Sequence, residues 1–152
     1  MTDSYRIRTA LQSDATQMTG LSLELGYPVS VTELGQRLQA LLASTRDVAL
    51  VAEGPALQLL GWIAAGERLV LESASRTEIT GLVVGAAARR SGVGRALVAA
   101  VEAWAVQQGS PLITVRSNIL RAESHPFYRS LGFRLKKTQH YYEKSLRGAS
   151  GA

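Results

Sequence analysis

The chain has 152 residues, of which 46% are hydrophobic, a size and composition typical of one globular domain with one core. It contains no cysteine, which excludes disulfide frameworks, cysteine-based zinc sites and cysteine nucleophiles. Lysine and arginine outnumber aspartate and glutamate by 17 to 12, giving a formal net charge of +5, which allows anionic partners without choosing among nucleic acid, membrane and small molecule.

The N-terminal segment MTDSYRIRTA carries an acid at Asp3 and no apolar run, a pattern that is not typical of a signal peptide. The apolar stretches are far shorter than the roughly 18 residues of a membrane span. Together with the lack of cysteine, these features predict a soluble cytoplasmic protein without membrane partners. We expect a single domain over residues 1–147 and a loose tail over residues 148–152.

The first half of the chain predicts strand, two helices and a hairpin. Alternation predicts a strand at Tyr5–Thr9, and a helix follows from Ser13 or Asp14 to about Gly26. A second helix opens at SVTE, where Ser30 and Glu33 have the spacing of a capping box. Two apolar runs on either side of Gly54-Pro55, VALVAE and LQLLGWIAA, then predict an antiparallel hairpin.

The second half predicts alternating strands and helices. The segment TEITGLVV (77–84) reads as a strand, and the glycine inside it marks a bulge or a close backbone approach. A helix begins near Val93 and ends at Gly109, a strand covers LITVRS (112–117), and a short helix runs from about 122 to 131. The segments FRLKK and TQHYYEKSL predict two last strands. The order β-α-α-β-β-β-α-β-α-β-β indicates a mixed α/β sheet with helices on both faces.

The segment ARRSGVGRALV (88–98) places two glycines and three arginines at the start of a helix. The first N–H groups of a helix lack intrahelical partners, and the helix dipole and the arginines favour an anion such as a phosphate there. A P-loop is excluded because Gly94 is followed by Arg95 and Ala96. A dinucleotide fingerprint is excluded because Leu97 stands where its third glycine belongs, and because the segment comes late in the chain.

The remaining pattern, Arg89-x-x-Gly92-x-Gly94 after a strand, resembles motif A of the GNAT superfamily of N-acetyltransferases, in which Gln or Arg is followed by two residues, Gly, any residue, and Gly or Ala. The segment SNILRAESHPFYRSLGF (117–133) is similar to the next motif of that superfamily. The resemblance covers nearly the whole chain. It implies a twisted, mostly antiparallel sheet that splays between its fourth and fifth strands.

The resemblance implies acetyl-CoA as co-substrate, with its diphosphate on the main-chain N–H groups of the glycine segment. Its pantetheine arm would pair with the preceding strand, as an added strand does at an exposed edge. Asn118 would bond the pantetheine or steady the fifth strand. The expected cofactor-binding residues are Leu82, Val83, Val84, Arg89, Arg90, Ser91, Gly92, Val93, Gly94, Arg95 and Asn118.

Acyl transfer to an amine needs a base, donors for the thioester oxygen and an acid for the leaving thiolate. The resemblance implies Tyr128 as the acid and a main-chain N–H of Val83 or Val84 as the donor. Glu78 is the best candidate for the base, and alternation places it on one strand face with Thr80 and Leu82. A solvated strand charge or a substrate anchor remains the alternative for Glu78.

The expected acceptor pocket lies between the first two helices and the strand ends, with Glu24, Tyr27 and Glu33 as candidates. Glu72, before the strand of Glu78, is the alternative to Glu78 as base and a further candidate substrate residue. The resulting hypothesis is an N-acetyltransferase that acetylates a primary amine of a small molecule by direct attack, without a metal. Acetylation of a protein N-terminus or lysine, and a catalytically silent acyl-CoA-binding module, are the alternatives. Aromatic residues make up only 6% of the chain, so the hypothesis of a nucleic-acid-binding module is supported by net charge alone. The family resemblance also allows a homodimer.

Overall fold

The computed structural model describes residues 4–116 and 124–147, and the chain forms two compact units, Met1–Ser117 and Asn118–Ala152. The first unit contains a five-stranded sheet in which the strands lie in chain order. The strands are β1 (Arg6–Thr9), β2 (Asp47–Glu53), β3 (Leu59–Arg68), β4 (Arg76–Val84) and β5 (Ile113–Val115). The first four strands pair antiparallel and β5 pairs parallel to β4, so the predicted mixed, mostly antiparallel sheet is confirmed.

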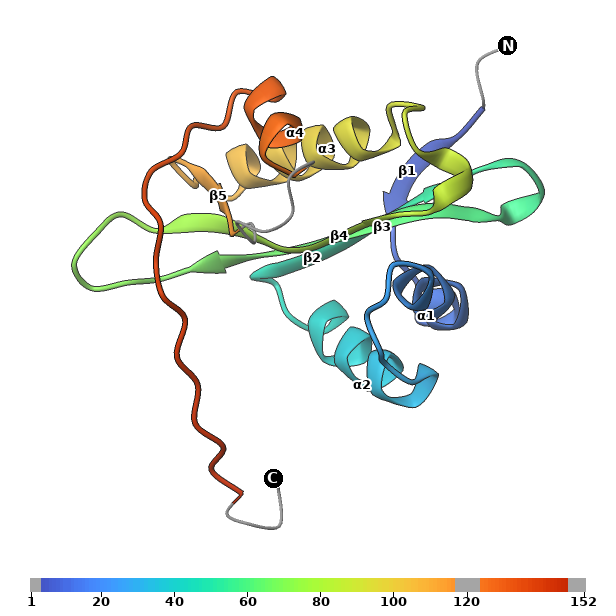
Figure 1. Cartoon of the computed structure of the whole chain (residues 1–152), viewed down its shortest axis with the longest axis horizontal. Helices are drawn as coiled ribbons and strands as arrows, with labels where there is room; N and C mark the ends of the chain where they lie inside the picture. The colour runs from blue at the N-terminus through green and yellow to red at the C-terminus, as the bar shows by residue number, and fades with distance from the viewer. Residues whose placement is uncertain (1–3, 117–123, 148–152) are drawn as a thin grey trace. The chain divides into compact units, whose positions relative to one another are not determined.

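Helices cover both faces of this sheet (Figure 1). Helices α1 (Ala15–Glu24) and α2 (Val31–Leu42) lie on one face, and α3 (Val93–Gln107) lies on the other. Short 3-10 turns occupy Gln12–Asp14, Pro55–Leu57 and Ala86–Ala88, and the last of these is labelled η3 here. None of the helices in the described part of the chain is long and apolar enough to cross a membrane.

The predicted capping box at the start of α2 is confirmed. The hydroxyl of Ser30 accepts a hydrogen bond from the N–H of Glu33 at 3.0 Å, and the carboxylate of Glu33 accepts one from the N–H of Ser30, also at 3.0 Å. Each side chain satisfies a main-chain donor that the helix itself leaves unpaired. These bonds lower the pKa of Glu33, the main-chain donor of Ser30 contributing most.

A core lies on each side of the sheet. Between the sheet and helices α1 and α2, the core contains Met18, Leu38 and Val51, which are 0–4% exposed, with Trp62 packed against them. Trp62 also donates its indole N–H to the main-chain oxygen of Met18 at 3.2 Å, which ties β3 to α1. The buried face of α3 consists of Val93, Leu97, Val98, Val101 and Ala105. These positions recur at the spacing of one helical stripe, so the apolar pattern that predicted the helix also sets the side that it buries.

A buried ion-pair network anchors β1, and its centre is Arg8. The guanidinium donates to both carboxylate oxygens of Asp14, at 2.8 and 3.0 Å, and to Glu53 on β2 at 3.1 Å. Arg6 adds a second bond to Glu53 at 3.1 Å, and the N–H of Leu11 donates to Asp14 at 2.7 Å. The side chains of Asp14 and Glu53 are only 8% and 10% exposed, so these carboxylates depend on their partners for the charge they carry.

The glycine within β4 marks a β-bulge, as predicted. Gly81 opposes Ala64 on β3 and Ile79 opposes Ala65, so that Thr80 has no residue opposite it. A Cβ on Gly81 would come within 2.9 Å of the ring of Trp62, so only glycine allows the indole to lie this close to the strand. The register of β4 therefore changes phase at Thr80.

Strands β4 and β5 share a short parallel ladder in the described part of the chain. The parallel ladder joins Thr77 to Ile113, Glu78 to Thr114 and Ile79 to Val115, and it ends there. Strand β4 continues to Val84, paired with β3 alone among the described residues. Beyond Ile79, the edge of β4 that faces away from β3, called the open edge here, has no partner strand among the described residues of the first unit.

The second unit contains α4 (Ser124–Ser130), with Pro126 in its first turn as expected. Gly132, at φ +93°, ends it, and the N–H of Phe133 returns to the main-chain oxygen of Tyr128 at 3.1 Å. The ring of Tyr128 packs edge-to-face against Phe127 and Phe133, with centroid distances of 5.1 and 5.5 Å.

The prediction of two last strands from FRLKK and TQHYYEKSL is wrong for the residues that the structure describes, because residues 133–147 form no strand. Polar and apolar alternation predicts which face of a strand is buried, but the strand itself needs a neighbour that accepts and donates its main-chain hydrogen bonds. Between Lys137 and Gln139 the sequence lacks the Gly, Asn or Pro that would turn it back on itself. Tyr141 and Tyr142 are accordingly more than 80% exposed.

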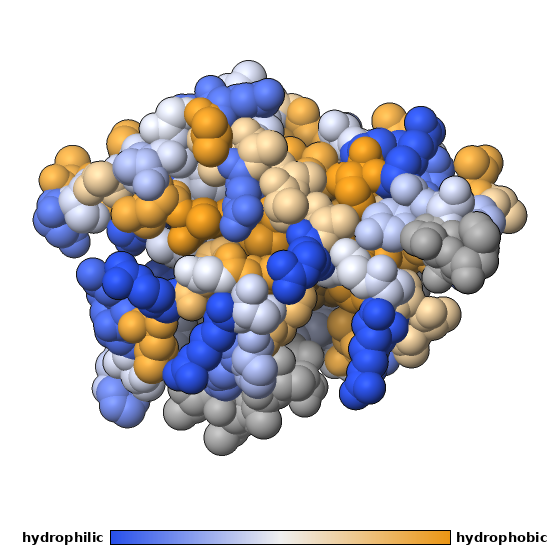
Figure 2. All heavy atoms as spheres, turned by 90° about the horizontal axis from the view of Figure 1, so that it is seen from above, coloured by the Kyte–Doolittle hydropathy of each residue, from blue (hydrophilic) through white to orange (hydrophobic). Residues whose placement is uncertain are grey.

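Hydrophilic and apolar side chains are interspersed on the face drawn in Figure 2, as far as the structure describes it. The basic residues of this chain are mostly arginines scattered along the sequence. Basic residues scattered in this way are common on solvated protein surfaces and do not by themselves indicate a nucleic-acid partner.

Candidate active site

The glycine loop, residues 85–92, joins the end of β4 to α3 and has an unusual backbone. Arg89 is extended, Arg90 lies in the left-handed region at φ +64°, and Gly92 lies there at φ +87°. The N–H and the hydroxyl of Ser91 both donate to the main-chain oxygen of Ala88, which fixes the turn. A left-handed arginine costs roughly 1 kcal/mol, and such strain is typical of ligand sites.

The start of α3 provides unpaired main-chain donors. The first intrahelical bond runs from the N–H of Ala96 to the oxygen of Gly92 at 3.0 Å, so the N–H groups of Val93, Gly94 and Arg95 precede the helical ladder. No side chain in the described part of the structure caps this end. The positive end of the helix dipole and these amides favour an anion, and the side chain of Val93, 1% exposed, anchors the turn in the core.

Three arginines surround these amides. Arg89, Arg90 and Arg95 are exposed, and none of them pairs with a carboxylate within residues 4–116 and 124–147. Their charges are therefore available to an anionic ligand. Main-chain donors, a helix N-terminus and three positive charges together favour an anionic ligand such as a diphosphate.

The open edge of β4 presents the main chain of Leu82 and Val84. The N–H of Gly85 donates to Leu60 on β3 at 2.8 Å, and the oxygen of Val83 also faces β3, where it would lie 2.7 Å from a Cβ on Gly61. Because successive peptide groups of a strand point to opposite edges, those of Leu82 and Val84 face away from β3. The sequence left the thioester donor open between Val83 and Val84, and of these two only Val84 has its main chain turned away from β3.

Glu78 lies on β4 between two arginines. Its carboxylate oxygens are 3.6 Å from the Nε of Arg116 and 4.0 Å from the Nε of Arg68, and its side chain is 14% exposed. No local pattern indicates these neighbours, because they come from β3 and from the residue after β5. The alternative of a fully solvated strand charge does not describe Glu78.

The predicted face of Glu78 is wrong, and the bulge is the reason. Glu78 opposes Gly66, whereas Gly81 and Val83 oppose Ala64 and Trp62. Every second residue of β3 from Trp62 to Gly66 lies on one face of the sheet, because the strand has no irregularity there. The β4 residues opposite them, Glu78, Gly81 and Val83, therefore lie together on that face. Strict alternation had grouped Glu78 with Thr80 and Leu82. Because Trp62 contacts Met18 of α1, the face of Glu78 is the one that α1 and α2 cover.

The candidate substrate residues do not all come together. Glu24 ends α1, and its Oε1 accepts a hydrogen bond from the N–H of Ala86 in the glycine loop. Tyr27 follows in the connection to α2 and is 44% exposed. Glu72 is exposed in the connection between β3 and β4, at the other end of β4 from Ala86, a separation of roughly 25 Å along nine strand residues.

The other two candidates lie outside this geometry. Asn118 falls outside the described residues. Tyr128 belongs to the second unit, where its ring contacts are those given above. Within the described residues, no three His, Cys, Asp or Glu side chains are grouped as metal ligands would be.

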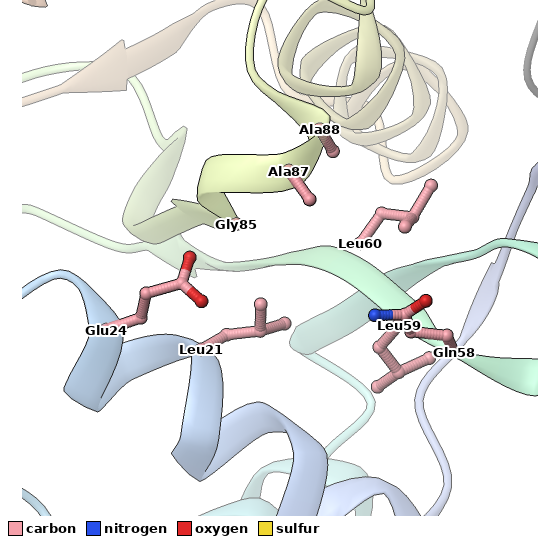
Figure 3. A pocket seen from close by; sticks show the side chains of 8 residues that line it. All are labelled: Leu21, Glu24, Gln58, Leu59, Leu60, Gly85, Ala87 and Ala88. Atoms are coloured by element: carbon pink, nitrogen blue, oxygen red, sulfur yellow. The ribbon is translucent and has the colours of Figure 1, made fainter.

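A small pocket adjoins the glycine loop, as Figure 3 shows, with a volume of about 50 Å³. Leu21 and Glu24 of α1, residues 58–60 at the start of β3, and Gly85, Ala87 and Ala88 line it. The pocket has room for water but not for a coenzyme, because ligand sites usually measure several hundred Å³. It is therefore a junction between α1 and the glycine loop.

A strand edge that leads into a glycine loop and a helix N-terminus suits a ligand made of an extended chain that ends in an anion. The model of the acetyltransferase (GNAT) family matches residues 23–133, and the chain belongs to this family. The protein is thus an acyltransferase whose co-substrate is acetyl-CoA.

Solved structures share this fold. Aminoglycoside antibiotic 6'-N-acetyltransferases from Acinetobacter baumannii and Acinetobacter haemolyticus are 22% and 26% identical, with TM-scores of 0.81 and 0.80. The alignments cover 94% and 93% of this chain and 99% of each neighbour. An aminoglycoside N-acetyltransferase solved in complex with CoA has a TM-score of 0.85 at 19% identity, covering 95% of this chain and 97% of its own. The comparison with curated proteins finds no match.

Proposed function

We propose that the protein transfers the acetyl group of acetyl-CoA to a primary amine of a small molecule by direct attack of the amine on the thioester. The observation that carries the proposal is the continuity of the open β4 edge with the glycine loop. An extended pantetheine chain and a diphosphate are joined in one molecule in CoA, and here a strand edge leads directly into an anion-binding turn. Three structural neighbours bear the name of aminoglycoside N-acetyltransferases, which supports a small-molecule acceptor.

In the proposed complex, the diphosphate lies on the N–H groups of residues 89–95, and the pantetheine pairs with Leu82 and Val84. Asn118 bonds the pantetheine. A main-chain N–H on the same edge of β4 donates to the thioester oxygen as negative charge develops on it, a form of stabilisation that is often the largest in acyl transfer. Acetyl-CoA supplies the acetyl group, and the amine nitrogen forms the new bond to its carbonyl carbon as the thiolate leaves.

Two side chains would handle the protons. Glu78, on the face of β4 that α1 and α2 cover, takes a proton from the ammonium directly or through water. Tyr128 donates a proton to the departing sulfur. A phenol with an ordinary pKa of about 10 stays protonated at neutral pH and can serve as that acid. Arg68 and Arg116 hold the carboxylate of Glu78 in place for the amine.

Replacing Gly92 with valine is expected to raise the Kd for acetyl-CoA at least tenfold. The nearest atom to an added Cβ, the Tyr5 hydroxyl, is 3.9 Å away, so the barrier is conformational: a β-branched residue resists φ +87° and would refold the turn. Isothermal titration with acetyl-CoA and with CoA measures the effect. Gly109→Val is the matched control, since Gly109 has φ +81° at the far end of α3. Equal binding by Gly92→Val and the wild type would contradict the diphosphate site.

Replacing Glu78 with glutamine is expected to lower kcat by about tenfold to 100-fold, because an amide cannot accept the proton. The Kd for acetyl-CoA should stay within about twofold, since the cofactor lies on main chain. The measurement is thiol release with a panel of primary amines over a range of pH. Glu67→Gln is the control, because Glu67 lies on β3, the strand next to that of Glu78, and also forms an ion pair with an arginine, Arg46, at 3.6 Å. An unchanged kcat would remove Glu78 as the base.

The same amine panel separates the other candidate functions. Acetyl-CoA binding without turnover would favour a silent acyl-CoA-binding module, and turnover with peptides alone would favour acetylation of a protein N-terminus or lysine. We also propose a cytoplasmic homodimer, to which the exposed Tyr141 and Tyr142 would contribute surface. Light scattering of the purified protein tests the oligomeric state.

A further inference from the structure

One hydrogen bond joins α1 to the glycine loop. The carboxylate of Glu24, the last residue of α1, accepts from the N–H of Ala86, which lies 62 positions later in the chain. Figure 3 shows the side chain of Glu24 directed from α1 toward Gly85. Ala86 is the first residue of η3, so its N–H is one of the donors that a helical turn cannot satisfy by itself.

The contact fixes the point where the loop leaves the sheet. The N–H of Gly85 donates to the oxygen of Leu60 at 2.8 Å, and the N–H of Ala88 donates to the oxygen of Gly85 at 3.0 Å. With Glu24 on the N–H of Ala86, three donors between 85 and 88 are held by β3, by α1 and by the loop itself. These three bonds therefore set the point from which the main chain of the rest of the loop continues, including the left-handed Arg90 and Gly92.

Gly85 allows α1 to approach this closely. A Cβ at position 85 would lie 2.9 Å from the Cδ2 of Leu21 and 3.5 Å from the Oε1 of Glu24. Gly85 has φ −63°, which any residue adopts, so the requirement for glycine here is one of space. The end of α1 therefore packs on the loop through both an apolar and a polar side chain.

The charge of Glu24 argues against a direct role in holding the cofactor. A carboxylate near a bound diphosphate is repelled by it, and only the arginines of the loop offset that repulsion. What Glu24 supplies to the loop is a hydrogen-bond acceptor. The sequence predicted Glu24 as an acceptor-amine residue, but its Oε1 is engaged by the main chain of the loop.

We propose that Glu24 is a positioning residue, which holds the glycine loop in the conformation that binds acetyl-CoA and thereby links α1 to the cofactor site. This inference rests on the proposed function, because it assumes that the loop binds the diphosphate. It assigns the C-terminal end of α1 to the cofactor half of the site as well as to the acceptor half.

The test compares Glu24→Ala with Glu24→Gln by isothermal titration with acetyl-CoA. Alanine removes the acceptor, and the Kd should rise about tenfold, as expected for one lost charge-assisted hydrogen bond. Glutamine keeps a carbonyl oxygen for the N–H of Ala86 and loses the charge, so its Kd should equal that of the wild type or fall below it. Glu102→Ala, on α3, is the control for loss of a carboxylate.

The outcomes separate this inference from the proposed function. If the wild type binds acetyl-CoA and Glu24→Ala binds it equally well, the positioning role is wrong. If both variants keep the Kd but raise the KM for the amine, Glu24 is an acceptor anchor and the inference is overturned. Failure of the wild type to bind would instead refute the proposed function.

A second readout does not depend on activity. The amide proton of Ala86, observed by NMR in the ligand-free protein, should move upfield in Glu24→Ala and much less in Glu24→Gln, because the strong acceptor is lost only in the first. Gly85→Ala provides an independent variant if Glu24→Ala does not fold, since the added Cβ displaces Leu21 and Glu24 from the loop. Its Kd for acetyl-CoA should rise, and an unchanged Kd would contradict the proposal.

Discussion

Replacing Tyr128 with phenylalanine is expected to lower kcat by about 100-fold or more, the range for loss of a general acid. Phenylalanine keeps the ring that packs between Phe127 and Phe133, so α4 and its C-terminal turn should remain folded. The change removes only the hydroxyl that is proposed to protonate the departing thiolate. The Kd for acetyl-CoA should stay within about twofold, since the hydroxyl acts mainly in the transition state.

Thiol release at saturating amine measures kcat for this variant, and titration calorimetry measures the Kd. Tyr142→Phe provides the matched control, because Tyr142 lies in the same unit and is 87% exposed. A kcat equal to that of the wild type would exclude Tyr128 as the acid. Proton delivery would then have to come from solvent or from another residue.

Replacing Asp14 with asparagine is expected to lower the free energy of unfolding by about 3 kcal/mol, the low end of the range for breaking a buried ion pair. The low end applies because Arg8 keeps its bond to Glu53. For a chain of this length, a loss of that size lowers Tm by about 10 °C. Calorimetry or circular dichroism measures it. Arg46→Met, which breaks an ion pair with a half-exposed arginine, should cost less than about 1 kcal/mol.

The pH dependence of the same variant provides a check of sign. Burial raises the pKa of Asp14, but the hydrogen bonds from Arg8 and from the N–H of Leu11 outweigh it, so that the pKa lies below its ordinary 3.8. A carboxyl with a lowered folded-state pKa stabilises the protein fully above its unfolded pKa, and this stabilisation is lost as the pH falls through the folded-state value. The difference in Tm between wild type and Asp14→Asn should therefore shrink below about pH 4. A difference that grows there would contradict the assignment.

Features that depend on residues close in sequence could be predicted. The capping box at Ser30 and Glu33 requires only two residues three positions apart. The glycine loop is recognised from Gly92, Gly94 and the neighbouring arginines in the sequence. Even the bulge had a local sign, the glycine inside an otherwise apolar strand. In each of these cases the physical cause lies within one turn or one strand.

Features that depend on a partner far along the chain could not be predicted. The bond from Ala86 to Glu24 spans 62 positions, and the arginines beside Glu78 come from β3 and from the residue after β5. The face of Glu78 was misassigned because a glycine indicates a bulge without saying which residue is the extra one. The two last strands failed for a related reason, since alternation carries no information on what a strand pairs with.

The extra residue at Thr80 makes β4 two half-strands that are out of phase by one position. Because Ile79 and Gly81 already oppose the consecutive residues Ala65 and Ala64, a chain without Thr80 could keep every one of these pairs in a regular ladder. The main chain of Leu82 and Val84 would stay on the edge away from β3, and the strand would lose only the local bend and added twist that a bulge causes. A deletion of Thr80 should therefore be much milder than a deletion of Ile63, which has partners on both β2 and β4.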